Sequence, residues 1–155
     1  MSALRIVAAA HTGITVSDLD RSIALYRDVF GFPVSQPVEC KGEIFDRLTG
    51  VDGAVMKVAR VTAPGHTLEL VQYVNPPGQD LPALRPCDTG TMHLAFQVED
   101  IDEVLAALAR AGVVAVNPAQ TVVDGPRARV RAVYTRDTDG VVIELIEIVK
   151  REAPA

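Results

Sequence analysis

An internal repeat is the feature that most constrains this fold. The segment that begins His11-Thr-Gly-Ile-Thr-Val-Ser-Asp-Leu-Asp aligns without a gap with the segment that begins His93-Leu-Ala-Phe-Gln-Val-Glu-Asp-Ile-Asp. In each copy one glutamate, Glu69 or Glu144, follows the histidine by about 50 to 60 residues, inside an apolar stretch. Such similarity implies one supersecondary unit that is used twice.

Each copy opens with a strand whose alternation places the histidine on one face, among small or polar residues. That face holds His11, Gly13 and Thr15 in the first copy and His93, Ala95 and Gln97 in the second. An amphipathic helix follows, over 18–30 in the first copy and 100–111 in the second. Ser17 or Asp18 can cap the first helix and Asp100 the second, where Glu103 completes a capping-box pattern. We expect the helices to cover the apolar strand face and to leave the histidine face for a site.

The two glutamates stand in strands of β-forming residues. Glu69 shares its strand face with Val71, and Glu144 shares its face with Ile146, so each carboxylate is expected to point into an apolar layer. A buried carboxylate without a partner is costly and needs a cation, a proton or hydrogen bonds. One divalent metal ion would satisfy both.

Composition limits the partners and the compartment. The chain has 155 residues, of which 48% are hydrophobic and 23% charged, as in ordinary globular proteins. A net charge of −5 without long charged runs argues against nucleic acid or an anionic membrane as a partner. Cys40 and Cys87 lack CxxC spacing and are interpreted as free thiols. Without an apolar run of membrane-spanning length or a leader pattern, we expect a cytoplasmic protein.

The chain organisation follows the repeat. We predict one domain, 1–155, made of a first module at 6–74, a proline-containing linker at 75–90 and a second module at 91–149. Each module reads β-α-β-β-β, which gives an α+β class. After the helices, the predicted strands lie near 34–39, 54–61 and 67–74 in the first module and near 113–116, 128–134 and 141–148 in the second.

The order of these segments resembles the vicinal oxygen chelate superfamily, which includes glyoxalases, bleomycin-resistance proteins and extradiol dioxygenases. The resemblance covers nearly all of 6–149, and its carrying segments start at His11, Leu68, Met92 and Asp137. It implies two βαβββ modules that form an open barrel-like cleft, often completed by a second subunit in a homodimer. It also implies metal ligands at His11, Glu69, His93 and Glu144.

The residue at position 69 narrows the chemistry. An iron site with two histidines and one carboxylate leaves positions open for oxygen, and in this superfamily it would correspond to His11, His93 and Glu144. A carboxylate at position 69 fills a fourth site, and the full set resembles bacterial glyoxalase I. Relatives that epimerise methylmalonyl-CoA carry glutamine at that position, yet the first helix and 90–101 are similar to epimerase-like members. We therefore predict a metal-dependent isomerase or lyase that acts on a small carbonyl substrate.

The expected mechanism is removal of a proton α to a carbonyl, with the metal stabilising the enediolate. Glu144 and Glu69 are both candidates for the catalytic base, and nickel, cobalt, zinc, manganese and iron(II) all suit the ligand set. Two alternatives stay open: a non-haem iron extradiol-type dioxygenase and a metal-free protein that binds or sequesters a small molecule.

Other polar residues have simpler interpretations. His66 is expected in an exposed turn, Glu39 and Glu43 in a solvated loop, and Glu147 at the surface. Arg127, Arg129 and Arg131 alternate along one predicted strand and suit either an anion or a solvated edge.

Overall fold

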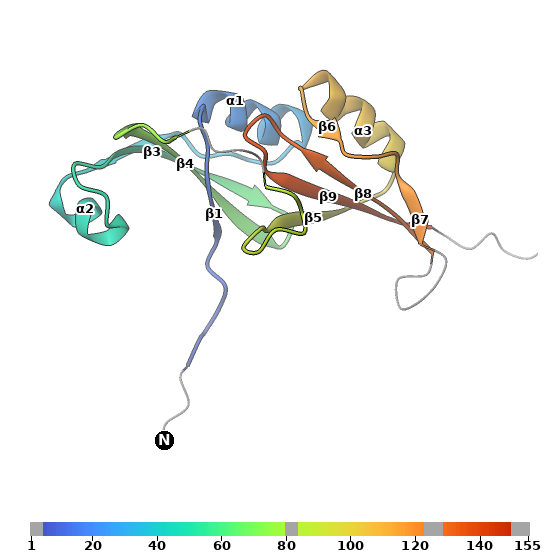
Figure 1. Ribbon diagram of the computed structural model, residues 1–155, viewed down its shortest axis with the longest axis horizontal. Helices are drawn as coiled ribbons and strands as arrows, with labels where there is room; N and C mark the ends of the chain where they lie inside the picture. Colours follow the sequence, from blue (N-terminus) through green and yellow to red (C-terminus); the bar gives the residue numbers. More distant parts are fainter. Residues whose placement is uncertain (1–4, 80–83, 123–128, 150–155) are drawn as a thin grey trace, which may run out of the picture. The chain divides into compact units, whose positions relative to one another are not determined.

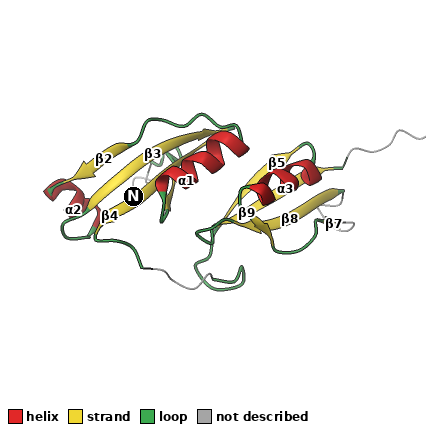
Figure 2. Ribbon diagram, turned by 90° about the horizontal axis from the view of Figure 1, so that it is seen from above, coloured by secondary structure: helices red, strands yellow, loops and turns green. Residues whose placement is uncertain are grey.

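The computed structural model describes residues 5–79, 84–122 and 129–149. The chain forms two compact units, 1–80 and 81–155, and the division falls inside the proline-containing segment 75–90. In each unit a helix packs on one face of a sheet (Figures 1 and 2). The predicted α+β class is thereby confirmed. Within the described ranges, no helix is long and apolar enough to cross a membrane.

The first unit has a four-stranded sheet in the order β1-β4-β3-β2. Strand β1 is parallel to β4, and the other neighbours are antiparallel. Along the chain the elements are β1 Thr12–Thr15, α1 Leu19–Ala24, the π-helical turn η1 Leu25–Val29, β2 Val38–Lys41, α2 Glu43–Thr49, β3 Val55–Ala63 and β4 His66–Asn75.

The second unit repeats this topology with the order β5-β9-β8-β6, and β7 also pairs with β8. Strand β5 is parallel to β9, as β1 is to β4. The elements are β5 His93–Val98, α3 Ile101–Arg110, β6 Val114–Ala115, β7 Gln120–Val122, β8 Val130–Arg136 and β9 Val142–Ile148. The first and last strands of each unit therefore lie side by side, which brings the histidine strand next to the glutamate strand.

The helices begin and pack as the sequence predicts. The Asp18 side chain accepts a hydrogen bond from the Arg21 backbone at 3.0 Å, and Asp100 accepts from the amides of Asp102 and Glu103. These caps satisfy amides that have no partner inside the helix. The buried core of each unit lies on the helix side of its sheet and includes Leu19, Tyr26, Val61, Leu68 and Leu70 in the first unit and Ile101, Leu108, Ile143 and Leu145 in the second.

Three local predictions differ from the structure. The strand expected near 34–39 is reduced to one bridge between Val34 and Val61, and β2 starts only at Val38. Pro37, just before β2, has no N–H to donate to a strand ladder. Helix α2 was not predicted because it buries no residue and leaves Ile44 and Leu48 exposed, so it has no core-facing stripe. The three-residue strand β7 was also missed.

Candidate metal site

In the first unit the strand register brings His11 and Glu69 together. Gly13 of β1 pairs with Glu69 of β4, and His11 stands two residues before Gly13, on the same face. The distance from His11 Nε2 to Glu69 Oε1 is 3.6 Å. Gly13 has no side chain, and the space that a Cβ would occupy there has no other atom within 4 Å. The small residue thus leaves the carboxylate accessible beside the imidazole.

The second unit builds the same pair from equivalent positions. Ala95 of β5 pairs with Glu144 of β9, and His93 stands two residues before Ala95. His93 Nε2 lies 3.2 Å from Glu144 Oε2. The Glu144 side chain is 6% exposed, against 21% for Glu69, while both histidines are partly open to solvent. The sequence repeat therefore produces the same arrangement twice: a histidine and a glutamate that lie diagonally across two parallel strands.

Both pairs fit two ligands of one metal ion. Nitrogen and oxygen ligands lie about 2.0–2.2 Å from zinc, so neighbouring ligands at octahedral or tetrahedral angles are about 2.8–3.6 Å apart. The 3.2 Å pair falls within that range and the 3.6 Å pair lies at its upper end. Imidazole with carboxylate also suits the first-row divalent ions. Among the described residues, no three His, Cys, Asp or Glu side chains gather around one point, so each pair by itself supplies two donors.

The residues opposite the two carboxylates differ between the units. Arg60 of β3 stands directly opposite Glu69, and its Nε donates to Glu69 Oε2 at 3.3 Å. Tyr134 of β8 takes the equivalent place opposite Glu144, and its ring centre lies 5.1 Å from that of His93. Neither residue was predicted from the sequence. The Pro64-Gly65 turn was the available signal, because it pairs Ala63 with His66 and so places Arg60 opposite Glu69.

Two of the simpler interpretations were wrong. His66 is not in an exposed turn but opens β4, where its Nε2 lies 2.8 Å from Thr12 Oγ1 and links β4 to β1. Glu147 is not a free surface residue: its side chain is 18% exposed and accepts from Arg131 at 3.0 Å.

Arg131, Glu39 and Glu43 each have an ion-pair partner. Arg131 also donates to Asp102 of α3 at 2.9 Å, which lowers the pKa of the Asp102 carboxyl. Arg131 is thus engaged by two carboxylates. Arg129 lies before β8 with a φ of 81°, and Arg127 falls outside the described residues. Glu39 and Glu43 have solvated side chains, as predicted, but they do not lie in a loop. Glu39 lies in β2 and pairs with Lys41, and Glu43 opens α2 and pairs with Arg47.

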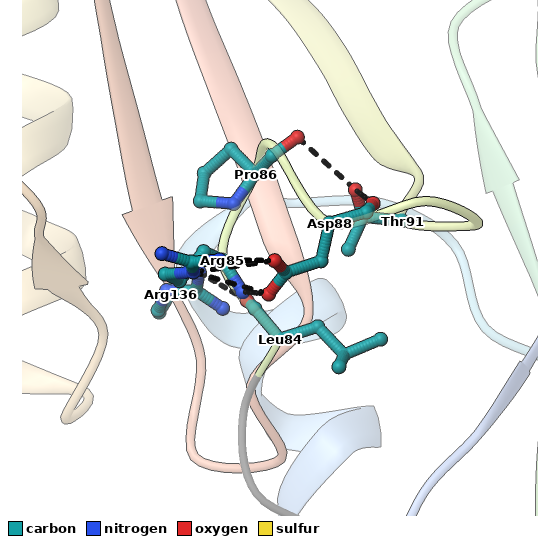
Figure 3. A network of polar contacts seen from close by, with 6 residues as sticks. All are labelled: Leu84, Arg85, Pro86, Asp88, Thr91 and Arg136. Carbon is teal, nitrogen blue, oxygen red and sulfur yellow. Dashed lines mark hydrogen bonds and ion pairs between the residues drawn. The ribbon is translucent and has the colours of Figure 1, made fainter.

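The segment that leads into β5 is held by its own polar network (Figure 3). Arg136, the last residue of β8, donates to the carbonyl oxygens of Leu84 at 2.6 Å and Gly140 at 3.2 Å. Arg85 pairs with Asp88 at 2.7 Å, and the Thr91 hydroxyl donates to the Asp88 carbonyl oxygen at 2.7 Å. These bonds fix the approach to His93 and join it to the turn that precedes the Glu144 strand.

A repeated βαβββ unit with a histidine–carboxylate pair in each copy defines the class of protein. The sequence model of the Glyoxalase/Bleomycin resistance protein/Dioxygenase superfamily matches residues 8–145, and the chain belongs to this superfamily. The chain is 33% identical over 148 residues to a 2-epi-5-epi-valiolone epimerase from an Actinomyces species, an alignment that covers 92% of this chain and 80% of the relative. It is 29% identical to the uncharacterized protein YaeR of Escherichia coli K12, with 88% and 93% of the two chains covered.

Solved structures agree with this membership, and the predicted vicinal oxygen chelate fold is confirmed. A glyoxalase family protein from Bacillus cereus superposes with a TM-score of 0.82 at 25% identity and covers 97% of this chain and 99% of its own. The fosfomycin resistance protein FosX from Listeria monocytogenes superposes with a TM-score of 0.63 at 19% identity, over 92% and 94% of the chains, which shows the fold alone. A mutant of the same FosX has been solved in complex with Mn(II) and 1S,2S-dihydroxypropylphosphonic acid.

Proposed function

We propose that this protein is a metal-dependent isomerase that removes a proton from a carbon α to a carbonyl and returns it on the opposite face. The observation that carries the proposal is the duplicated His–Glu pair, with nitrogen-to-oxygen distances of 3.6 and 3.2 Å. In this proposal His11, Glu69, His93 and Glu144 together hold one divalent ion. Nickel, cobalt, zinc, manganese and iron(II) are the candidate ions.

Two observations support an isomerase over the other members of the superfamily. The relative at 33% identity is an epimerase, and its name gives a ketone as its substrate. A carboxylate at position 69 supplies a fourth protein ligand, whereas the iron triad of dioxygenases uses three. A hydroxyketone of the valiolone kind is therefore the first substrate class to test, ahead of hemithioacetals and acyl-CoA esters.

The ion would supply Lewis acidity for the carbonyl oxygen and for the negative charge that develops there. The protein's own residues hold the ion and move the proton. Glu69 and Glu144 come from different units, and epimerisation needs one group to accept a proton and one to deliver it. We assign these two tasks to the two glutamates, each of which has an imidazole beside it. Proton transfer by a positioned carboxylate typically contributes about 10²–10⁴ to the rate.

Metal binding is the first experiment. Protein purified without chelator should contain about one divalent ion per chain, measured by elemental analysis. His11→Ala and His93→Ala should each lower the content sharply, and the matched control His66→Ala, a histidine outside the proposed set, should retain it. Unchanged stoichiometry in both variants would refute the site.

Substrate turnover is the second experiment. A panel of hydroxyketones, hemithioacetals and acyl-CoA esters is incubated in deuterium oxide with nickel, cobalt or zinc. The proposal expects solvent deuterium at the carbon next to the carbonyl, without oxygen consumption. Oxygen-dependent turnover of a catechol would instead establish a dioxygenase. Tight binding of small molecules with no turnover and no effect of metal would establish a binding protein.

A further inference from the structure

The two halves of the proposed site hold their carboxylates in different ways. Glu144 has a side chain that is only 6% exposed, so packing limits its rotamers. Glu69 is 21% exposed and receives a guanidinium, because Arg60 stands opposite it in the antiparallel β3–β4 pair. At the position equivalent to Arg60, the second unit has Tyr134, which cannot form an ion pair of this kind.

The two oxygens of Glu69 are divided between two neighbours. Oε1 faces His11 Nε2 at 3.6 Å, and Oε2 accepts from Arg60 Nε at 3.3 Å. A charge-assisted hydrogen bond to one oxygen fixes the plane of a carboxylate and therefore the direction of the other oxygen. Groups that orient metal ligands in this way typically change metal affinity by about 10-fold to 100-fold when they are removed.

We infer that Arg60 is a positioning residue, which binds Glu69 Oε2 and keeps Glu69 Oε1 directed toward His11 for a shared divalent cation. This inference rests on the proposed function, because it gives Glu69 the role of a metal ligand. Glu69 is the more exposed of the two carboxylates, and the hydrogen bond from Arg60 limits its freedom.

The charge of Arg60 acts in the opposite direction, since a guanidinium repels a cation. Its side chain is 67% exposed, so water and salt screen that repulsion. We expect the orienting hydrogen bond to have the larger effect, so removal of Arg60 should weaken metal binding rather than strengthen it.

Cobalt titration of the metal-free protein tests this inference without any substrate. Calorimetry gives the affinity, and the visible absorption of bound Co²⁺ reports its ligand geometry. Arg60→Met should bind Co²⁺ about 10-fold to 100-fold more weakly than the parent, with an altered spectrum. Arg60→Lys keeps a cationic donor and should recover at least half of the loss on a logarithmic scale. Arg47→Met removes an exposed arginine of α2 and should bind like the parent.

The outcomes separate this inference from the proposed function. Equal or tighter Co²⁺ binding by Arg60→Met overturns the positioning role. Arg60 would then act on the cation only through its charge. Loss of binding that Arg60→Lys does not restore at all also overturns it. His93→Ala, measured in the same titration, tests the site itself: if it binds like the parent, the proposed four-residue site is wrong. Weak binding by His93→Ala with parent-like Arg60→Met rejects the inference alone.

Discussion

At the residue scale, the two glutamates occupy equivalent places in the repeat but have different neighbours. Glu69 contacts His11 and Arg60, and Glu144 lies beside His93 with Tyr134 opposite. Under the proposed function, one of these carboxylates would serve one face of the reacting carbon and the other would serve the opposite face.

This arrangement predicts divided roles for Glu69 and Glu144 in proton exchange. Glu69→Gln and Glu144→Gln each keep an oxygen ligand but remove a carboxylate that can carry a proton. Each should lower kcat for epimerisation by about 10²–10⁴, the range for loss of one general acid or base. In deuterium oxide, each variant should still exchange the α proton of one epimer and lose exchange on the other. Proton NMR of the two epimers, incubated separately, measures this.

The matched control is Glu43→Gln, which changes an exposed carboxylate of α2 and should leave exchange unchanged. If one glutamine variant keeps the full rate with both epimers while the other abolishes both exchanges, a single base serves both faces. The first residue would then be a ligand only. Circular dichroism spectra of all variants verify that the fold is intact.

At the element scale, a helix or strand could be predicted from the sequence where its apolar residues form a pattern that faces the core. Strand β1 and helix α3 were recognised because alternation, apolar spacing and the Asp100 cap agree with one another. Helix α2 was missed because Ile44 and Leu48 are exposed, so burial does not organise its sequence. The residues of the two His–Glu pairs could be predicted, because strand alternation shows which face carries each histidine and each glutamate. The Arg60 contact depends on the register of the β3–β4 hairpin, which the sequence signals only through the Pro64-Gly65 turn.

Arg131 links helix α3 to the sheet of the second unit. Its guanidinium bridges Asp102 of α3 and Glu147 of β9, and it is 29% exposed. In the first unit Gln72 of β4, at the place equivalent to Glu147, links to the helix start with neutral groups: it accepts from the Leu19 amide at 3.2 Å and donates to the Ser17 carbonyl oxygen at 3.0 Å. Both devices hold the start of a helix against the strand that carries the glutamate.

Removal of the Arg131 bridge should lower stability in a pH-dependent way. The hydrogen bond from Arg131 holds the pKa of Asp102 below its ordinary value of 3.8. A lowered carboxyl pKa stabilises the fold above that ordinary value, and this contribution is lost as pH falls through the folded-state pKa. Arg131→Met should therefore lower Tm by roughly 2–4 °C at neutral pH, a modest effect because Asp102 is largely exposed.

Thermal unfolding followed by circular dichroism between about pH 3 and pH 7 measures this difference. The gap between parent and Arg131→Met should shrink as pH drops below the ordinary Asp value of 3.8. Arg110→Met, which removes an exposed arginine at the end of α3, serves as the control. A gap that stays constant down to about pH 3 would mean that the loss comes from packing of the long side chain and not from the ion pair.

At the scale of the whole molecule, each sheet ends in strands that have one paired side. The sheet orders place β2 at one end of the first sheet and β6 at one end of the second. Large apolar side chains are exposed next to these strands: Val38 at 57%, Ile44 at 74%, Leu48 at 76% and Val114 at 66%. Natural proteins usually cover sheet edges, and clustered exposed apolar side chains mark interfaces.

These surfaces predict a homodimer in which β2 and α2 of the first unit are covered. Light scattering should give about 33 kDa, twice the 16.6 kDa of one chain, across micromolar concentrations. Leu48→Glu places a charge on the exposed apolar face of α2 and should shift the protein toward monomer. Ala106→Glu adds the same charge at an exposed position of α3, outside the predicted interface, and should leave the dimer intact. A monomeric parent would refute the dimer, and a dimeric Leu48→Glu would place its interface away from α2.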